Sequence, residues 1–382
     1  MITRETVDKF RDLPTPFYYY DLDVLNQTCQ KVEKESRYSG YRIHYALKAN
    51  PNPRILNIIS GYGFGADCVS WNEIERAMSC GFKPSDIVFA GVGKTDMDIT
   101  KALNAEILCF NCESVPEMEV IDSIARNMGK IATIALRINP YIEAYTHKYI
   151  TTGIEESKFG INTWELDDVL KKLAVLENVR LKGIHFHIGS QITRMSVFKS
   201  LCARINELLD WFLSHNIDLE IVNVGGGLGI DYENPDQPAP FEDYFSMIHE
   251  FINIRPEQNI HIEPGRSIVG QCGSLISRVL FVKNGSNTVF AIIDAGMTDL
   301  IRPALYQAHH KIENLTSAGN LFRYDVVGPV CESSDTFGKF IELPETRRGD
   351  IIAIRSAGAY GESMASRYNL RDLPAVIFSD EI

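Results

Sequence analysis

Lys48 lies directly after an apolar run at residues 41–47 that is typical of a buried strand. A lysine at the mouth of such a strand is costly to desolvate unless its amine is used or its charge is paired. Lysines held in this way form Schiff bases with carbonyl compounds. The residue type and its position therefore indicate a reactive amine, although many lysines that end strands simply reach water.

Further residues with chemical use stand at the ends of other strand-like runs. Residues 225–229 read Gly-Gly-Gly-Leu-Gly, and such a backbone can approach an anion closely and offer it N–H groups. Carboxylates and imidazoles complete the set at Asp67, His185, His187 and Glu263. Together these types suit a phosphorylated aldehyde cofactor bound through a lysine. Taken singly, a glycine cluster also serves as a tight turn, and a His-x-His strand also serves as core with one metal ligand.

Eight strand-like runs, separated by stretches with helical apolar spacing, position these residues. The strand-like runs cover residues 41–47, 65–70, 87–90, 107–111, 131–139, 181–189, 219–225 and 259–264. The helical spacing covers residues 73–80, 115–128, 166–176, 197–212 and 241–252. This alternation predicts an α/β fold in which parallel strands close into a (β/α)8 barrel. An open, doubly wound sheet stays an alternative, because periodicity alone does not close a barrel.

A barrel would bring the chemical residues together. Active-site residues of such barrels gather at the carboxyl ends of the strands, and a phosphate sits near the loops after strands seven and eight. The seventh run leads into the glycines at residues 225–229, and the eighth leads into Glu-Pro-Gly-Arg at residues 263–266. We therefore expect Lys48, Asp67, His187 and Glu263 to share one rim with the glycine run.

The pattern changes after about residue 270. Strand-like runs at residues 274–282, 288–293, 324–330 and 351–354 are joined by turns with few helical stretches. We expect two domains, a cofactor-binding barrel over residues 22–270 and a mainly antiparallel β domain over residues 271–382. The short run at residues 16–20 is expected to join the β domain, which then also includes residues 1–21.

Composition narrows the class of protein. The chain has 382 residues, of which 45% are hydrophobic and 23% are charged, as in ordinary soluble globular proteins. Its formal net charge is −12 and it lacks a dense basic tract, which argues against nucleic acid or a membrane as partner. No run approaches the ~18 apolar residues of a membrane helix. Eight scattered cysteines suggest reduced thiols, so we expect a cytoplasmic enzyme.

The chain resembles the pyridoxal-phosphate (PLP) decarboxylases that combine a barrel with a β domain. The motifs that carry the resemblance follow the family's order at residues 45–50, 185–191, 225–229, 263–266, 331–333 and 357–360. They span almost the whole chain and are specific when taken together. Two departures are visible: Ser334 stands where the family usually has glycine after Cys-Glu-Ser, and the chain is shorter than many members.

The resemblance implies PLP as the cofactor and assigns residues to it. Lys48 would bind the aldehyde, and Glu263 would face the pyridine nitrogen and keep the ring protonated. His187 would stack on the ring, with Asp67 close by. The other implied cofactor contacts are Ser190, Gly227, Gly265, Arg266 and Tyr360.

The resemblance also implies a reaction, the decarboxylation of meso-2,6-diaminopimelate to L-lysine and carbon dioxide, the last step of lysine biosynthesis. The implied substrate contacts are Arg266, Arg302, Tyr306, Glu332 and Tyr360. Two arginines and a glutamate suit a group that bears both a carboxylate and an ammonium. Arg302 is the more diagnostic arginine, because in related decarboxylases the arginine of Glu-Pro-Gly-Arg helps to bind phosphate. Cys331 is implied as the proton donor, in a homodimer that donates Cys331 and Glu332 across the interface.

Other functions stay open at this point. A sibling decarboxylase would act on ornithine, lysine, arginine or a carrier-linked glutamate, but ornithine and lysine would leave an arginine without its carboxylate. An amino-acid racemase on the same fold would need an acid/base, usually tyrosine, where this chain has Cys331. A small PLP-carrying homeostasis protein resembles only a lone barrel, and the β domain argues against it.

Three further motifs are interpreted as structural. Residues 91–95 mimic a nucleotide-binding loop, but Val88 stands where that pattern needs glycine. The Cys-x-x-Cys spacing at residues 109–112 lacks the second pair that a zinc site needs, and we expect no metal. His309 and His310 are interpreted as surface or loop residues.

Overall fold

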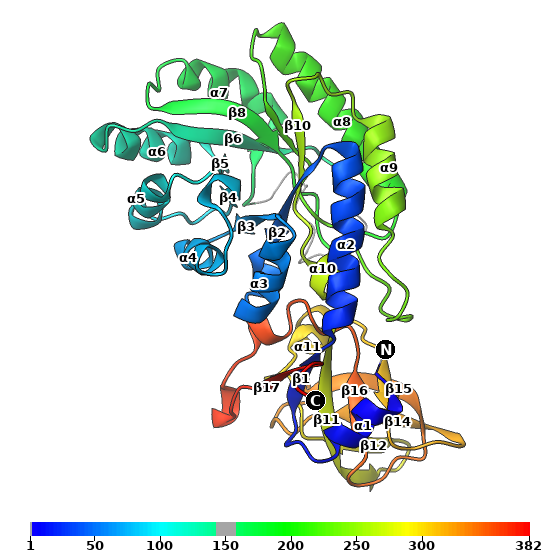
Figure 1. Ribbon diagram of the computed structural model, residues 1–382. Helices are drawn as coiled ribbons and strands as arrows, with labels where there is room; N and C mark the ends of the chain where they lie inside the picture. The colour runs from blue at the N-terminus through cyan, green and yellow to red at the C-terminus, as the bar shows by residue number, and fades with distance from the viewer. Residues whose placement is uncertain (1, 143–157) are drawn as a thin grey trace. The chain divides into compact units, whose positions relative to one another are not determined.

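The chain forms two compact units (Figure 1). The computed structural model describes residues 2–142 and 158–382. One unit, which we call the barrel unit, consists of Cys29–Gly229 and Pro240–Gly265. The other, which we call the β unit, consists of Met1–Thr28, Ile230–Ala239 and Arg266–Ile382. The segment Ile230–Ala239 therefore lies between two barrel segments in sequence but packs within the β unit.

Eight parallel strands close into a ring in the barrel unit. They are β2 (Arg42–Ala46), β3 (Gly65–Cys68), β4 (Ile87–Phe89), β5 (Cys109–Cys112), β6 (Ala132–Asn139), β8 (Val179–His185), β9 (Ile221–Asn223) and β10 (Asn259–Ile262). Two parallel pairings close the ring, β10 with β2 and β5 with β6. The predicted (β/α)8 barrel is confirmed, and the open sheet is excluded because β10 pairs directly with β2. A short strand, β7 (Ile161–Asn162), pairs with β6 outside the ring.

Helices alternate with these strands (Figure 1). They are α2 (Leu22–Ser39), α3 (Pro53–Gly61), α4 (Trp71–Ser79), α5 (Asp96–Ala105), α6 (Val115–Asn127), α7 (Leu166–Leu173), α8 (Met195–Ser214) and α9 (Phe241–Phe251). Asn52, Ser70 and Ser114 each accept a hydrogen bond from a backbone N–H in the first turn of the helix that follows. Such caps satisfy N–H groups that a helix leaves without a partner. Within the described residues, no helix combines the length and apolarity that crossing a bilayer demands.

The β unit contains one eight-stranded sheet. Its strands are β1 (Phe17–Tyr20), β11 (Gly273–Asn284), β12 (Val289–Ile293), β13 (Ile312–Asn314), β14 (Leu321–Val327), β15 (Thr336–Pro344), β16 (Ile351–Ile354) and β17 (Ala375–Phe378). All pairs are antiparallel except β12 with β14 and β1 with β17. The predicted mainly antiparallel domain is confirmed, and the run at residues 16–20 joins it as β1. Three strands of this sheet were not predicted from the sequence. Strand β13 is short, and β15 and β17 have few buried residues, which weakens their apolar alternation.

An aromatic core holds the N-terminal segment to this sheet. A short helix, α1 (Arg4–Phe10), ends in Phe10, whose ring packs edge-on against Phe17 and Tyr19 of β1. These rings share one buried cluster with residues of β11 and β16, namely Ile276, Ile351 and Ala353. Because this cluster is buried, β1 near the N-terminus belongs to the same unit as the strands of the C-terminal part of the chain.

Strand β3 tolerates no side chain at its first position. A Cβ on Gly65 would lie 2.1 Å from the carbonyl oxygen of Asp86 and 2.6 Å from Nδ1 of His44. We predict that Gly65→Ala lowers the free energy of unfolding by about 1–3 kcal/mol, because the strands must separate to accept the methyl group. Denaturant unfolding measures the change. Gly93→Ala, where a Cβ meets nothing within 4 Å, is the control, and equal stability of the two variants would contradict the prediction.

Candidate active site

The amine of Lys48 lies against a buried carboxylate in the barrel unit. Strand β2 ends at Ala46, and the short 3-10 turn Leu47–Ala49 carries Lys48. In the register between β2 and β3, Ala46 pairs with Asp67. Lys48 Nζ donates to Asp67 Oδ2 at 2.6 Å, and the lysine side chain is 33% exposed whereas Asp67 is 0% exposed. Two of the predicted site residues therefore meet at the ends of adjacent strands.

Glu263 follows β10 and accepts hydrogen bonds from three other strands. Its Oε1 accepts from Nδ2 of Asn223 at 2.7 Å and from Nδ2 of Asn111 at 3.3 Å. Its Oε2 lies 3.0 Å from Nε2 of His185. The side chain of Glu263 is 3% exposed. Because the carboxylate is buried and has donors on both oxygens, the barrel holds it in one orientation.

The surroundings set the charge of these groups. Burial by itself raises the pKa of Glu263, but the charge and hydrogen bond of His185, together with the charge of Lys48, hold that pKa well below its usual range. Burial and then the charge of Glu263 raise the pKa of Asp67, and Lys48 opposes them. Burial, followed by the charge of Lys48, lowers the pKa of His187 well below its usual value. The site therefore offers an ionised carboxylate at Glu263 and a neutral imidazole at His187 near neutral pH.

A glycine bend at residues 225–229 follows β9. Gly225 and Gly227 have φ values of 74° and 113°, in the region that favours glycine. A Cβ on Gly226 would lie 2.2 Å from the carbonyl oxygen of Glu263, and the N–H of Gly226 lies 3.5 Å from Nδ1 of His187. The loop after Ser190 lies alongside the bend, because the N–H of Ile192 donates to the carbonyl of Gly227 at 2.8 Å.

The ends of β2 and β10 also touch. The N–H of Ala46 donates to the carbonyl of Pro264 at 3.1 Å. A Cβ on Gly265 would lie 3.1 Å from the Cβ atoms of both Ala46, which precedes the turn that carries Lys48, and Ala49, which ends it. Glu263 and Gly265 therefore lie beside the segment that carries Lys48.

These groups fit the PLP cofactor expected from the sequence. The amine of Lys48 can bind an aldehyde, and the ionised carboxylate of Glu263 suits a protonated pyridine nitrogen. The backbone N–H groups of the glycine bend suit a phosphate. The barrel unit thus supplies a group of the right chemical type for each reactive part of the cofactor.

Two amides of this site were missed by the sequence analysis. Asn111 and Asn223 are polar residues in otherwise apolar strand runs, and that contrast is the signal that could have revealed them. Asn111 lies within the Cys-x-x-Cys pattern, whose cysteines, Cys109 and Cys112, are buried and free. Only the closed barrel shows that both amides donate to one carboxylate.

In the β unit, two predicted arginines meet at one tyrosine. Arg266 Nη1 and Arg302 Nη1 donate to the hydroxyl of Tyr232 at 2.6 and 2.7 Å. The ring centroid of Tyr360 lies 4.9 Å from Cζ of Arg266. Arg302 begins the helix α11 (Arg302–Tyr306), which ends at the partly buried Tyr306. Nothing in the sequence around Tyr232 indicates this role.

His310 lies in a loop, as one reading of the sequence predicted, but it is not a surface residue. His310 is 1% exposed, and its Nε2 lies 2.9 Å from Nη1 of Arg302. Its neighbour His309 is exposed and pairs with Glu233 at 3.1 Å, as expected of a surface residue. Adjacent histidines in a loop look alike in sequence, and only the folded chain shows which one turns inward.

Cys331 and Glu332 lie in an exposed segment of the β unit. All eight cysteines of the chain lie in the described residues, and Cys331 is the one that is exposed. Oε1 of Glu332 accepts from the hydroxyl of Tyr368 at 2.6 Å, and its Oε2 accepts from the hydroxyl of Ser334 at 3.2 Å. The serine that replaces the usual glycine therefore contacts the glutamate of the Cys-Glu-Ser motif.

Lys94, in the segment that mimics a nucleotide-binding loop, has a structural role. Its side chain is 1% exposed, and Nζ contacts Oε1 of Glu117 at 2.6 Å. The same amine donates to the carbonyl oxygens of Gly91 and Asn111 at 2.7 and 3.0 Å. These contacts use all three hydrogens of the ammonium group.

Comparisons with known proteins find a family model and close relatives for this chain. Residues 22–270 match the family model described as "Pyridoxal-dependent decarboxylase, pyridoxal binding domain". The diaminopimelate decarboxylase of Bacteroides thetaiotaomicron is 55% identical over 379 residues, which cover 98% of each chain. The crystal structure of diaminopimelate decarboxylase from Helicobacter pylori complexed with L-lysine is 42% identical, with a TM-score of 0.92 over 97% of this chain and 93% of that one. The corresponding enzyme of M. jannaschii, also with L-lysine, is 33% identical with a TM-score of 0.90, over 98% of this chain and 89% of that one.

Proposed function

This chain belongs to the diaminopimelate decarboxylases, a family of pyridoxal-dependent decarboxylases, and from that membership we propose how its residues carry out the reaction. The enzyme is a carboxy-lyase that converts meso-2,6-diaminopimelate to L-lysine and carbon dioxide in lysine biosynthesis. The observation that carries the proposal is the meeting of Lys48, Asp67 and the triply hydrogen-bonded Glu263 in one barrel.

The barrel residues would hold the cofactor. Bound PLP supplies an electron sink for the electron pair that remains when carbon dioxide leaves. Lys48 Nζ would bind the aldehyde carbon, with Asp67 keeping the amine in place through their 2.6 Å contact. Glu263 would hold a proton at the pyridine nitrogen, a role that suits a carboxylate whose pKa is held low by its neighbours. We assign stacking to the neutral His187, and phosphate binding to Ser190, Gly227, Gly265 and Arg266.

The β-unit residues would bind the substrate and return the proton. Arg302 would grip the carboxylate at the distal end of the substrate, with Tyr306, Tyr360 and Glu332 as further contacts. Cys331 Sγ would deliver a proton to the α-carbon. Its exposure supports this role, whereas burial raises the pKa of Cys109 and of other cysteines and leaves them inert.

We further propose a homodimer in the cytoplasm, with Cys331 and Glu332 donated to the site of the other subunit. The exposure of both residues supports the first part, since a group that serves another subunit must be accessible in the free chain. The eight free cysteines support the second, since thiols persist in a reducing compartment.

Lys48→Ala should abolish the visible absorbance that PLP shows when joined to a lysine amine. Turnover should fall by about 1,000-fold or more, because the covalent attachment is lost. Absorbance spectra, carbon dioxide release and circular dichroism measure cofactor, activity and fold. Lys171→Ala, at an exposed lysine of α7, is the control. An unchanged spectrum in the Lys48 variant would remove this lysine from its role.

Arg302→Ala should reduce kcat/KM for diaminopimelate by about 100-fold, because a charged, two-point grip on a carboxylate is lost. The spectrum of the bound cofactor should stay unchanged. Carbon dioxide release from a panel of diaminopimelate, lysine and ornithine measures the specificity. Arg323→Ala, at an exposed residue of β14, should change neither property. If the Arg302 variant keeps its preference for diaminopimelate, the sibling decarboxylases return as candidates.

Mixing the variants Lys48→Ala and Cys331→Ala tests the shared site. Each is expected to be inactive or slow alone. If sites are built from two subunits, a hybrid dimer contains one intact site, and random exchange restores about a quarter of the wild-type activity. Activity is measured after denaturation and joint refolding. Recovery no greater than the sum of the separately refolded variants argues against sharing.

A further inference from the structure

The segment Ile230–Ala239 belongs to the β unit although barrel residues precede and follow it in sequence. Three of its side chains contact residues elsewhere in that unit, namely Tyr232, Asp236 and Glu233, which pairs with His309. Tyr232 meets the arginines Arg266 and Arg302, and Asp236 meets Arg355. The segment is thus attached to the rest of the β unit by three side chains that are close together in sequence.

Tyr232 lies between two guanidinium groups that would otherwise repel each other. Its hydroxyl oxygen accepts from Arg266 Nη1 at 2.6 Å and from Arg302 Nη1 at 2.7 Å. Cζ of Arg302 also lies 5.1 Å from the centre of the tyrosine ring, within reach of a cation–π contact. A single oxygen that accepts from two cations keeps both side chains in place.

His310 holds the same nitrogen of Arg302 from another direction. Nη1 of Arg302 lies 2.9 Å from Nε2 of His310, and an arginine can only donate. Nε2 is therefore the acceptor, and Nδ1 carries the hydrogen that is donated to the carbonyl of Arg355 at 2.9 Å. Tyr232 and His310 together use both hydrogens of this nitrogen. Nε of Arg302 is buried and has no hydrogen-bond partner among the described residues.

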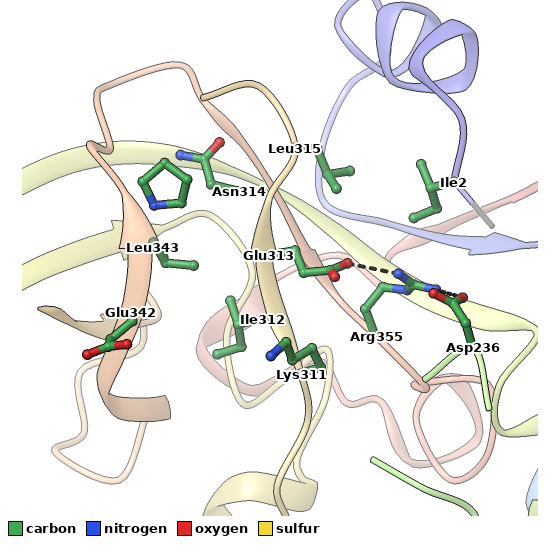
Figure 2. Close-up of a pocket in the computed structure, with 11 residues that line it drawn as sticks. Ile2, Asp236, Lys311, Ile312, Glu313, Asn314, Leu315, Glu342, Leu343 and Arg355 are labelled. Atoms are coloured by element: carbon green, nitrogen blue, oxygen red, sulfur yellow. Dashed lines mark hydrogen bonds and ion pairs between the residues drawn. The ribbon is translucent and has the colours of Figure 1, made fainter. Parts of the chain in front are cut away.

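Arg355 stabilises this arrangement through two ion pairs. Figure 2 shows its guanidinium between Glu313 and Asp236. Its Nη1 donates to Glu313 Oε2 and its Nη2 to Asp236 Oδ1, both at 2.8 Å. Glu313 lies on β13 and Arg355 follows β16, so the two ion pairs of Arg355 join the sheet to the segment that carries Tyr232. Arg355 thus contributes both the backbone carbonyl that orients His310 and the side chain that holds Asp236.

We propose that Tyr232 and His310 are positioning residues for Arg302, and that they turn the Nε side of its guanidinium toward the distal carboxylate of the substrate. This inference rests on the substrate role proposed above for Arg302. Because Nη1 is held by two fixed acceptors, the donors that are left are those of Nε and Nη2. These two form one edge of the planar group, the edge that binds a carboxylate through parallel hydrogen bonds.

The electrostatics of the cluster agree with the geometry. Burial raises the pKa of Tyr232, but the charges of Arg266 and Arg302 outweigh burial and lower it below its usual value. Burial and then the charge of Arg302 lower the pKa of His310, which keeps its ring neutral. An electron-rich phenol oxygen and a neutral imidazole are the acceptors that a fixed guanidinium needs.

Product and product analogue provide the test. L-lysine keeps the carboxylate that Arg302 would bind, whereas cadaverine has the same chain and amines without a carboxylate. We expect Tyr232→Phe and His310→Leu in the holoenzyme to raise the inhibition constant of L-lysine about tenfold. The constant for cadaverine should stay unchanged, and KM for diaminopimelate should rise more than kcat falls. His310→Gln, whose side-chain oxygen can accept from Arg302, should restore most of the L-lysine affinity. Tyr62→Phe, at a tyrosine of the barrel unit, is the control.

The outcomes separate this inference from the proposed function. If Arg302→Ala weakens L-lysine but the Tyr232 and His310 variants do not, the positioning role is wrong and the role of Arg302 stands. Equal weakening of L-lysine and cadaverine would also overturn the positioning role, since general damage to the site would explain it. If Arg302→Ala leaves the L-lysine constant unchanged, the substrate role of Arg302 fails and this inference fails with it.

Discussion

The buried carboxylate of Glu263 is the constraint around which the barrel is arranged. An ionised carboxyl group inside a protein is very unfavourable unless donors surround it. Here the donors come from β5, β8 and β9, and the carboxylate itself follows β10. Side chains from these three strands must therefore reach one carboxylate although β5 pairs with neither β8, β9 nor β10, and a closed ring of parallel strands brings them together. The direct pairing of β2 with β3 places Asp67 and the turn of Lys48 at the ends of neighbouring strands.

The β unit holds buried cations in place with hydrogen-bond acceptors, as the barrel holds the buried carboxylate with donors. Arg266 and Arg302 are nearly buried, and each is held by the hydroxyl of Tyr232. A site that binds a carboxylate needs such guanidinium groups before the anion arrives, and acceptors without full charge keep them oriented without neutralising them. Tyr232 and the imidazole of His310 are acceptors of this kind. The chain passes from one unit to the other directly after Gly229 and Gly265, so two cofactor motifs end where the β-unit segments begin.

Much of this architecture can be predicted from the amino-acid sequence. The alternation of apolar runs predicts the barrel. Charge or glycine is unusual beside a buried strand, and this contrast identifies Lys48, Asp67, Glu263 and the glycine bend as candidate site residues. Asn111 and Asn223 give only a weaker signal, an amide in an otherwise apolar run, and Tyr232 gives none. Amides and phenols are common in strands and loops, and their use here is defined entirely by what lies opposite. His310 shows the same limit, since its loop position predicts exposure and its burial follows from packing against Arg302.

The sequence by itself determined the fold class, the reactive types and the family, because these follow from local periodicity and from motifs of adjacent residues. The tertiary structure decided which neutral side chains orient the charged ones. That choice depends on closing the ring between β10 and β2 and on packing Ile230–Ala239 into the β unit. Hydrogen bonds act over about 3 Å, so a donor and its acceptor can be recognised only once distant segments have been brought together.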